Sequence, residues 1–463
     1  MLFSSFEFLY LFLPLTVFAY FCVPKGGKNS VLLVASLIFY GIASPRLLPL
    51  LLAVSLADWG FGRFIEAQIL KNKTKRADTA IILAVIFNVG ILIFFKYFDP
   101  LLSALRLEPL GIELPVGISF YVFQAMSYVF DVRRRTVEAQ KNALTFLTYV
   151  SLFPQLVAGP IVRYSEVEQE LSSRRHTLKG VADGLSLFSL GLAKKVLLAN
   201  GAGLIWERAV LLSGRGATVL GAWLGLVGFA FQIYFDFSGY SDMARGLGRI
   251  FGFNFPENFR YPYISRSITD FWRRWHITLS SWFREYVYIP LGGNRRSTTR
   301  TYLNLLAVWS LTGLWHGASL NFLLWGLYFF LVLSLEKLFL LKIIKKAPAL
   351  AGHIYALFLI LIGWLIFAAD GLKSPFVYFV NLFGIGCPLF DSDSLYELGR
   401  NLPFLIIMAV GCTPLASKAF RWIKQRSVLW AKGIRNALSL ISFILCTCYL
   451  ADSGYNPFLY FRF

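Results

Sequence analysis

The sequence has few charged residues and little of what disulfide or metal sites need. Of its 463 residues only 15% are charged and 57% are hydrophobic, and the mean hydropathy is +0.61. Soluble domains carry about a quarter charged residues, so this chain has too little polar surface to cover itself in water. The five cysteines form no CxxC pair, which excludes a thiol redox motif or a cysteine zinc site. We expect the chain to reside in a lipid bilayer.

Several sequence motifs of soluble enzymes are also missing. There is no G-x-S-x-G, no phosphate-binding P-loop and no G-x-G-x-x-G, so hydrolase, nucleoside triphosphatase and dinucleotide-binding functions have no support. No internal repeat is evident, which weakens the transporter folds built from inverted repeats. The apolar segment 6–23 follows no basic stretch and precedes no small-residue cleavage site, so we interpret it as a retained first transmembrane helix.

The net charge of +20 is spread over short basic clusters between apolar segments. A nucleic-acid-binding domain would concentrate such charge on one soluble module, so we predict no nucleic-acid partner. The positive-inside rule instead places the basic loops in the cytoplasm. It predicts cytoplasmic loops at 71–76, 133–141, 163–179, 342–346 and 418–432, outward loops at 98–115 and 387–400, and both termini in the periplasm.

Apolar stretches of about 16–22 residues predict an all-α polytopic membrane protein with about 11–12 transmembrane helices. The predicted spans are 6–23, 30–44, 47–65, 79–97, 115–130, 181–199, 218–240, 301–316, 320–339, 352–370, 402–417 and 436–452. Segments 143–161 and 375–386 are short or contain proline, and we predict that they are re-entrant.

Region 241–300 combines ten arginines with four acidic residues and many aromatic side chains. Within it, 267–288 has too many arginines to face lipid and too many tryptophans and phenylalanines to lie in water. We therefore predict a helix that lies at the cytoplasmic interface or enters the protein interior.

Two of the four histidines are candidates for chemistry. His176 lies in a charged loop and His353 at a helix end, where structural roles are expected. His316 ends an apolar span and His276 lies in the arginine-rich region, and ionisable side chains at membrane depth are costly unless they function. Neither has cysteine or carboxylate neighbours at metal-ligand spacing, so we predict no metal site. A buried neutral imidazole suits general-base catalysis of acyl transfer, although a backbone hydrogen bond between helices is the alternative.

Six segments together resemble one family. They are Leu114-Pro-Val-Gly-Ile-Ser-Phe-Tyr121, Phe153-Pro-Gln-Leu-Val-Ala-Gly-Pro-Ile161, Tyr234-Phe-Asp-Phe-Ser-Gly-Tyr-Ser-Asp242, Asn254-Phe-Pro-Glu-Asn-Phe-Arg-Tyr-Pro-Tyr263, Phe271-Trp-Arg-Arg-Trp-His-Ile-Thr-Leu-Ser280 and Leu314-Trp-His-Gly317. The chain resembles the membrane-bound O-acyltransferases of the bacterial alginate O-acetyltransferase type, which include peptidoglycan O-acetyltransferase relatives. The similarity runs in order through the chain.

This resemblance implies a single integral membrane domain over 1–463, with helices in a ring around a central tunnel. It implies that His316 is catalytic and that His276 is the second motif histidine. It further implies transfer of an acetyl group from a cytoplasmic thioester, acetyl-CoA, across the bacterial inner membrane for polysaccharide O-acetylation. A periplasmic partner of the SGNH esterase class would complete the transfer, and no bound cofactor is implied.

Other residues are expected to support the two histidines. On one helix Arg273 and Ser280 would share the face of His276, while Arg273 and Arg274 could instead be interfacial anchors. We expect Asp236 and Asp242 to pair with arginines of 241–300 as counter-ions, more than to act as acid or base. Further tunnel candidates are Trp315, Tyr240 and Asn258.

Two other functions stay open on the sequence. A transporter of an acyl carrier or lipid would use a tunnel without bond chemistry, and a membrane scaffold would be active only through a periplasmic acetyltransferase. The acceptor polysaccharide stays open too. The short stretch after the last span favours peptidoglycan or a general exopolysaccharide.

Overall fold

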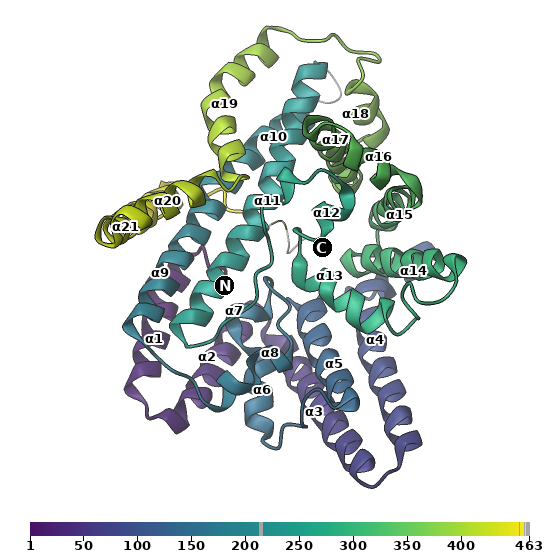
Figure 1. The fold of residues 1–463 in the computed structure, drawn as a ribbon, viewed down its shortest axis with the longest axis vertical. Helices are drawn as coiled ribbons and strands as arrows, with labels where there is room; N and C mark the ends of the chain where they lie inside the picture. Colours follow the sequence, from purple (N-terminus) through teal and green to yellow (C-terminus); the bar gives the residue numbers. More distant parts are fainter. Residues whose placement is uncertain (213–215, 453, 458, 460–463) are drawn as a thin grey trace. The chain divides into compact units, whose positions relative to one another are not determined.

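The computed structural model describes residues 1–212, 216–452, 454–457 and 459, and this described part is helical with no β-strand. The chain divides into two compact units, one of residues 1–188 with 240–257 and one of residues 189–239 with 258–463. Helices α9 (Leu178–Ala193) and α11 (Val219–Ile250) each begin in one unit and end in the other. The predicted all-α polytopic class is confirmed (Figure 1).

The first unit holds the N-terminal helices. They are η1 (Glu7–Phe12), α1 (Leu13–Cys22), η2 (Lys25–Gly27), α2 (Lys28–Ala43), η3 (Pro45–Leu47), α3 (Leu48–Leu70), α4 (Thr74–Ala104), α5 (Ile118–Arg134), α6 (Ala143–Ser151), α7 (Phe153–Leu156) and α8 (Tyr164–Ser172). The predicted re-entrant segment 143–161 contains two short helices, α6 and α7.

Helix α3 packs against both α4 and α5. Gly62 of α3 lies against the Tyr128 ring, and a Cβ there would come within 2.4 Å of a ring carbon. The absence of a side chain lets the two helices approach closely, as is common in membrane proteins. Asn88 of α4 donates a hydrogen bond of 2.8 Å to the buried carboxyl of Asp58 on α3.

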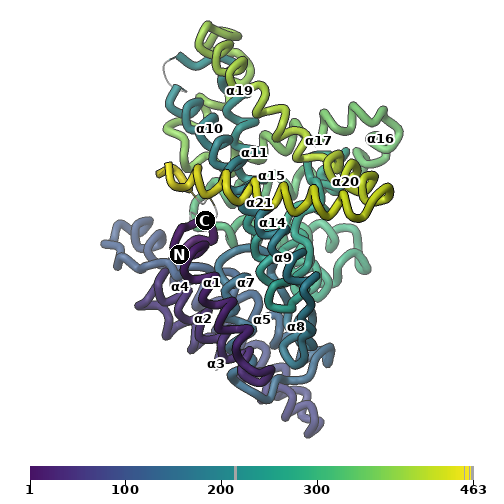
Figure 2. The backbone as a smooth tube through the Cα atoms, turned by 90° about the vertical axis from the view of Figure 1, so that its left-hand side faces the viewer, coloured from purple at the N-terminus to yellow at the C-terminus, as the bar shows by residue number. Residues whose placement is uncertain are grey.

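The second unit holds the remaining helices. They are η4 (Lys194–Ala199), α10 (Asn200–Leu212), η5 (Pro262–Ile264), α12 (Ile268–Trp272), α13 (Ile277–Phe283), η6 (Arg284–Tyr288), α14 (Thr298–His316), α15 (Leu320–Leu335), η7 (Glu336–Leu340), α16 (Leu341–Lys346), α17 (Ala349–Phe367), η8 (Ala369–Gly371), α18 (Pro375–Asn381), α19 (Ser392–Gly411), α20 (Leu415–Arg426) and α21 (Val428–Asp452). Helices α20 and α21 pack side by side (Figure 2).

Helices α14 and α15 form the closest helix pair around the candidate site. A Cβ on Gly313 of α14 would come within 2.4 Å of the Phe322 carbonyl oxygen, and one on Gly326 of α15 within 2.4 Å of the Trp309 carbonyl oxygen. Small residues at these two crossings let the backbones touch. Because the pair is fixed in this way, the last residue of α14, His316, has a defined place.

The prediction of one continuous helix over 267–288 is wrong, because the helix is interrupted at His276. Helix α12 ends at Trp272 and α13 begins at Ile277, and His276 between them has φ +43. Tertiary hydrogen bonds replace the helical ones: the Arg274 carbonyl accepts from the Arg260 N–H (2.9 Å), and the Ile277 N–H donates to the Asn258 carbonyl (3.0 Å). A local pattern does not reveal such distant partners.

The predicted spans fall on helical segments, but fewer helices can cross a bilayer by length and composition. Among the described residues six helical segments qualify, and a seventh if α19 and α20 form one span broken by a 63° bend. The predicted span 402–417 runs across that bend. Other predicted spans form shorter helices, such as the 17-residue α5 and the 16-residue α15.

Candidate functional site

His276 and His316 line one small cavity inside the second unit. Its volume is about 30 Å³, and the walls are almost entirely apolar. The lining comprises His276, His316, Asp236, Thr312, Ile233, Leu279 and Leu459 with the aromatic rings of Phe237, Trp272, Trp275, Trp325, Trp364 and Phe367. The structure therefore brings together the two histidines that the sequence selected, 40 residues apart, in a water-poor environment.

His316 is held by aromatic rings at the end of α14. Its side chain is buried (7% exposed), and its ring meets Trp325 and Phe367 edge-on at centroid distances of 5.1 and 5.2 Å. The preceding residue, Trp315, contacts both histidine rings, at 4.9 Å from His316 and 6.2 Å from His276. Packing of this kind fixes the orientation of the imidazole.

Asn258 determines the tautomer of His276. The Nδ1 atom lies 3.1 Å from Asn258 Oδ1, which also accepts from the Thr278 N–H (3.3 Å) and the Thr278 hydroxyl (3.0 Å). Since that oxygen is an acceptor for Thr278, it accepts from His276 too, so Nδ1 carries the proton of the neutral ring. The Nε2 lone pair is then the basic atom of the ring. Burial, and after it the neighbouring His316, hold the pKa of His276 well below its ordinary value.

Asp236 forms a buried ion pair with Lys195 of η4, at 2.9 Å with both side chains at most 3% exposed. The sequence predicted an arginine of 241–300 as its partner, and that prediction is wrong. Lys195 also donates to Asn200 Oδ1 (2.9 Å) and to the Pro457 carbonyl, while Asp236 accepts from the Leu459 N–H (2.9 Å). The pair therefore holds the segment that contributes Leu459 to the cavity wall. Asp242 does pair with an arginine of the region, Arg245 (3.2 Å), in the first unit.

Of the residues that the sequence selected, His316, His276 and Asp236 line the cavity, and the others do not. Trp315 and Asn258 contact the histidines from outside the lining. Arg273 is exposed, and Arg274 pairs with Asp270 (3.0 Å), so both fit the alternative of interfacial anchors. Tyr240 belongs to the first unit, where its ring stacks on Phe3 at 4.5 Å.

Ser280 lies in α13, after the interruption of the helix at His276, and is half-buried. Its backbone N–H donates to the His276 carbonyl (3.1 Å), which is a helix-capping contact. The prediction that Arg273 shares a helix face with His276 is wrong, because the two residues lie on either side of the end of α12 and not on one helix.

The sequence interpretation missed Glu336 and Lys195. The Glu336 carboxylate is fully buried and accepts from the Ile268 N–H (2.7 Å), the Thr269 N–H (2.8 Å) and the Thr269 hydroxyl (2.6 Å), so it caps α12. Both residues fall inside predicted spans. The rule that marked the histidines, an ionisable group at membrane depth, would have found them too.

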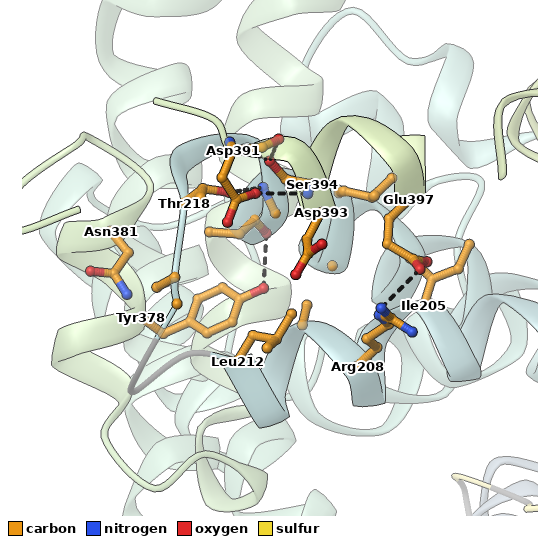
Figure 3. A pocket seen from close by; sticks show the side chains of 17 residues that line it. Ile205, Arg208, Leu212, Thr218, Tyr378, Asn381, Asp391, Asp393, Ser394 and Glu397 are labelled. Atoms are coloured by element: carbon orange, nitrogen blue, oxygen red, sulfur yellow. Dashed lines mark hydrogen bonds and ion pairs between the residues drawn. The ribbon is translucent and has the colours of Figure 1, made fainter. Parts of the chain in front are cut away.

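A second cavity of the same unit, about 90 Å³, contains none of the motif residues. Figure 3 shows that its polar groups bond mostly to one another. Arg208 pairs with Glu397 (3.1 Å), the Tyr378 hydroxyl donates to the Ala222 carbonyl (2.8 Å), and Asp391 caps α19 through the Ser394 N–H (2.7 Å). In the described part of the chain no three histidine, cysteine or carboxylate side chains are grouped as metal ligands.

Comparison with known proteins places this site in a family. The profile of the MBOAT, membrane-bound O-acyltransferase family, matches residues 113–372, which include both histidines. A probable alginate O-acetylase AlgI of Pseudomonas putida is 35% identical over the whole of both chains. A peptidoglycan O-acetyltransferase of Helicobacter pylori is 34% identical over all of this chain and 98% of its own length.

A more distant relative, a teichoic acid D-alanyltransferase of Bacillus subtilis, is 29% identical over 46% of this chain and 56% of its own. These relatives are named for acyl transfer to different polymers. Together with the family match, they show that this chain belongs to the membrane-bound O-acyltransferase family and is a multi-pass membrane O-acyltransferase.

Proposed function

We propose that this chain transfers an acetyl group from cytoplasmic acetyl-CoA across the inner membrane for O-acetylation of an extracytoplasmic polysaccharide. The observation that carries the proposal is the meeting of His316 and His276 at one enclosed aromatic cavity. A water-poor cavity strengthens the electrostatic interactions that stabilise an oxyanion and protects the thioester from hydrolysis.

In this proposal His316 is the general base. It takes the proton of the acceptor hydroxyl as that oxygen attacks the thioester carbonyl carbon. The new C–O bond forms, the C–S bond breaks, and the proton passes to the departing thiolate. His276, whose neutral ring carries its lone pair on Nε2, assists proton transfer or orients the acyl group.

The dimensions of the cavity support a short acyl group. About 30 Å³ bounded by tryptophan and phenylalanine rings leaves no room for a long acyl chain. Large aromatic rings in a packed interior do not yield easily, because overpacking is destabilising.

The acceptor follows from the relatives. Their names concern alginate and peptidoglycan, so we propose a polysaccharide acceptor, reached through a periplasmic SGNH-type partner that completes the transfer. The same proposal places both termini in the periplasm.

The direct test uses purified protein in liposomes with radiolabelled acetyl-CoA, comparing wild type with His316→Ala. Label is followed as released acetate and on an added periplasmic partner. We expect the loss of a general base to lower turnover by about 10²–10⁴-fold. His353→Ala is the matched control, because His353 bonds to the Ser265 carbonyl (3.2 Å) away from the cavity and should retain full turnover.

Three results would overturn the proposal. Equal thioester cleavage by His316→Ala and wild type would make the histidine structural. Label that crosses the membrane with the thioester intact would identify a transporter. If the isolated protein cleaves no thioester and the partner alone does, the chain is a scaffold.

A further inference from the structure

The first unit contains a polar pocket that acyl transfer does not use in the account above. Its volume is about 340 Å³, within the range typical of small-molecule sites. It opens where the turn between α1 and α2 meets the loop between α8 and α9, and its lining includes Lys25, Lys28, Arg174 and His176. Lys25 and Lys28 stand at the beginning of Lys25–Ala43, one of the segments long and apolar enough to cross a bilayer, and Arg174 and His176 lie in the loop after α8.

The cations of this pocket have no carboxylate partners. Among the described residues no salt bridge involves Lys25, Lys28 or Arg174, and the acidic residue of the lining, Glu170, meets Arg174 only through its backbone carbonyl (2.9 Å). Three cations against one carboxylate leave the lining with two excess positive charges. Cations gathered without partners are typical of a site for an anion.

The protonation of the pocket shows the same repulsion. The pKa of His176 is lowered by burial and then by Lys28, with smaller contributions from Arg174 and Lys25. A bound anion would offset this repulsion and raise the pKa of His176.

The cationic groups are held in place before any ligand binds. The buried Tyr20 hydroxyl lies 2.8 Å from His176 Nε2, accepts from Arg174 Nε (3.1 Å) and donates to the Phe251 carbonyl (2.9 Å). The Lys28 ammonium lies 4.5 Å from the Tyr20 ring centre, and the Arg174 guanidinium 4.5 Å from that of Phe253. Such preorganisation lowers the entropic cost of binding.

We propose that this pocket binds the phosphate groups of a ligand, with Arg174, Lys28 and Lys25 as the charged contacts. A planar guanidinium and two ammonium groups suit a phosphate monoester or a diphosphate. The ligand is either a soluble phosphorylated compound or the headgroup of an anionic phospholipid. This inference is independent of the acyl transfer proposed above.

The test measures binding of inorganic pyrophosphate and of adenosine 3′,5′-bisphosphate to the full-length protein in phosphatidylcholine nanodiscs by calorimetry. We expect Arg174→Ala and Lys28→Ala each to weaken binding by about tenfold or more, because each removes one charge-assisted contact. The matched control is Arg175→Ala, since Arg175 is adjacent, exposed and outside the lining. Arg174→Gln and Lys28→Gln serve where the alanine variants do not fold.

A second readout needs no substitution. Pyrophosphate should raise the pKa of His176, followed in the wild-type protein by the imidazole resonances, and should leave the resonances of His353, a residue outside the pocket lining, unchanged. Nanodiscs with phosphatidylglycerol distinguish the two sources: loss of pyrophosphate binding there identifies a lipid headgroup site, and unchanged binding a soluble ligand. No binding by wild type in either lipid, or equal binding by all variants, would overturn the proposal.

Discussion

At the scale of single residues, Asn258 determines what His276 can do. Its side-chain oxygen receives hydrogen bonds from His276 and Thr278, so the imidazole keeps its proton on Nδ1 and its lone pair on Nε2. Partners of this kind fix the orientation of a functional imidazole, and their loss usually costs 10–100-fold in function.

We therefore expect Asn258→Ala to lower kcat for thioester cleavage by about 10–100-fold with little change in KM. Asn258→Asp should still accept from Nδ1, but its negative charge favours the imidazolium and raises the pKa of His276. The role proposed for His276 requires the neutral ring, so the acidic limb of the pH–rate profile should move to higher pH. Measuring that profile for both variants checks the assignment.

An unshifted acidic limb in Asn258→Asp would contradict this role. Asn401→Asp is a suitable control, because Asn401 bonds within α19 to Glu397 and does not line the cavity. Its profile should match that of wild type.

At the scale of elements, Glu336 of η7 fixes the start of α12. A carboxylate at a helix N-terminus satisfies otherwise unpaired N–H groups and interacts favourably with the helix dipole. Its two backbone partners, Ile268 and Thr269, open the helix that leads to His276. The position of the second histidine thus depends on an acid 60 residues away in the sequence.

Glu336→Ala should therefore destabilise the protein strongly. It leaves two N–H groups and the hydroxyls of Thr269 and Tyr355 without their acceptor, and each bond to a charged group is worth about 1.5–3 kcal/mol. The expected result is a lower unfolding midpoint in detergent and lower activity. Glu336→Gln keeps one acceptor oxygen, so its unfolding midpoint should lie between those of wild type and Glu336→Ala.

The control for Glu336 is Glu108→Gln, in an exposed loop. It should leave the unfolding midpoint unchanged. An unchanged midpoint for Glu336→Ala would mean that α12 is held by packing alone.

The Lys195–Asp236 pair links η4, α11 and the segment of Leu459. Removing one partner leaves an uncompensated buried charge. We therefore expect Lys195→Met or Asp236→Asn to lower the free energy of unfolding by about 3–5 kcal/mol. The double substitution should be more stable than either single one, because both charges are gone. Unfolding of the four proteins in a double-mutant cycle measures this coupling.

The exposed pair Arg133–Asp78 provides the comparison. Each single substitution in this pair should lower the free energy of unfolding by less than about 1 kcal/mol, since solvent screens such pairs. Equal costs for the two pairs would show that water reaches Lys195 and Asp236.

At the scale of the whole molecule, the orientation in the membrane can be tested by labelling. In a variant without native cysteines, Asp393→Cys should react with a membrane-impermeant maleimide on intact cells. Lys73→Cys should react only after permeabilisation, because the positive-inside rule keeps its loop in the cytoplasm. Both positions are exposed, so accessibility within the protein does not limit the reaction. The reverse pattern would invert the topology.

Much of the fold and site could be predicted because it depends on the composition of single segments of the chain. Apolar length and the scarcity of charge indicate membrane helices, since a bilayer offers no water to satisfy a non-helical backbone. The cost of an ionisable group at membrane depth selected His316 and His276, and both line the cavity. The same reasoning did not separate Arg273 and Arg274 from them, because a continuous helix would have placed Arg273 and His276 on one face.

The sequence by itself thus determined a helical membrane protein, its family motifs and its two central histidines. Only the tertiary structure decided that the helix is interrupted at His276, that Asp236 pairs with Lys195, and that Glu336 caps α12. Each of these depends on hydrogen bonds or ion pairs between residues tens of positions apart. Hydrophobic patterns and charge clusters report a residue's surroundings along the chain, whereas buried polar groups take whichever partner the packed helices bring within reach.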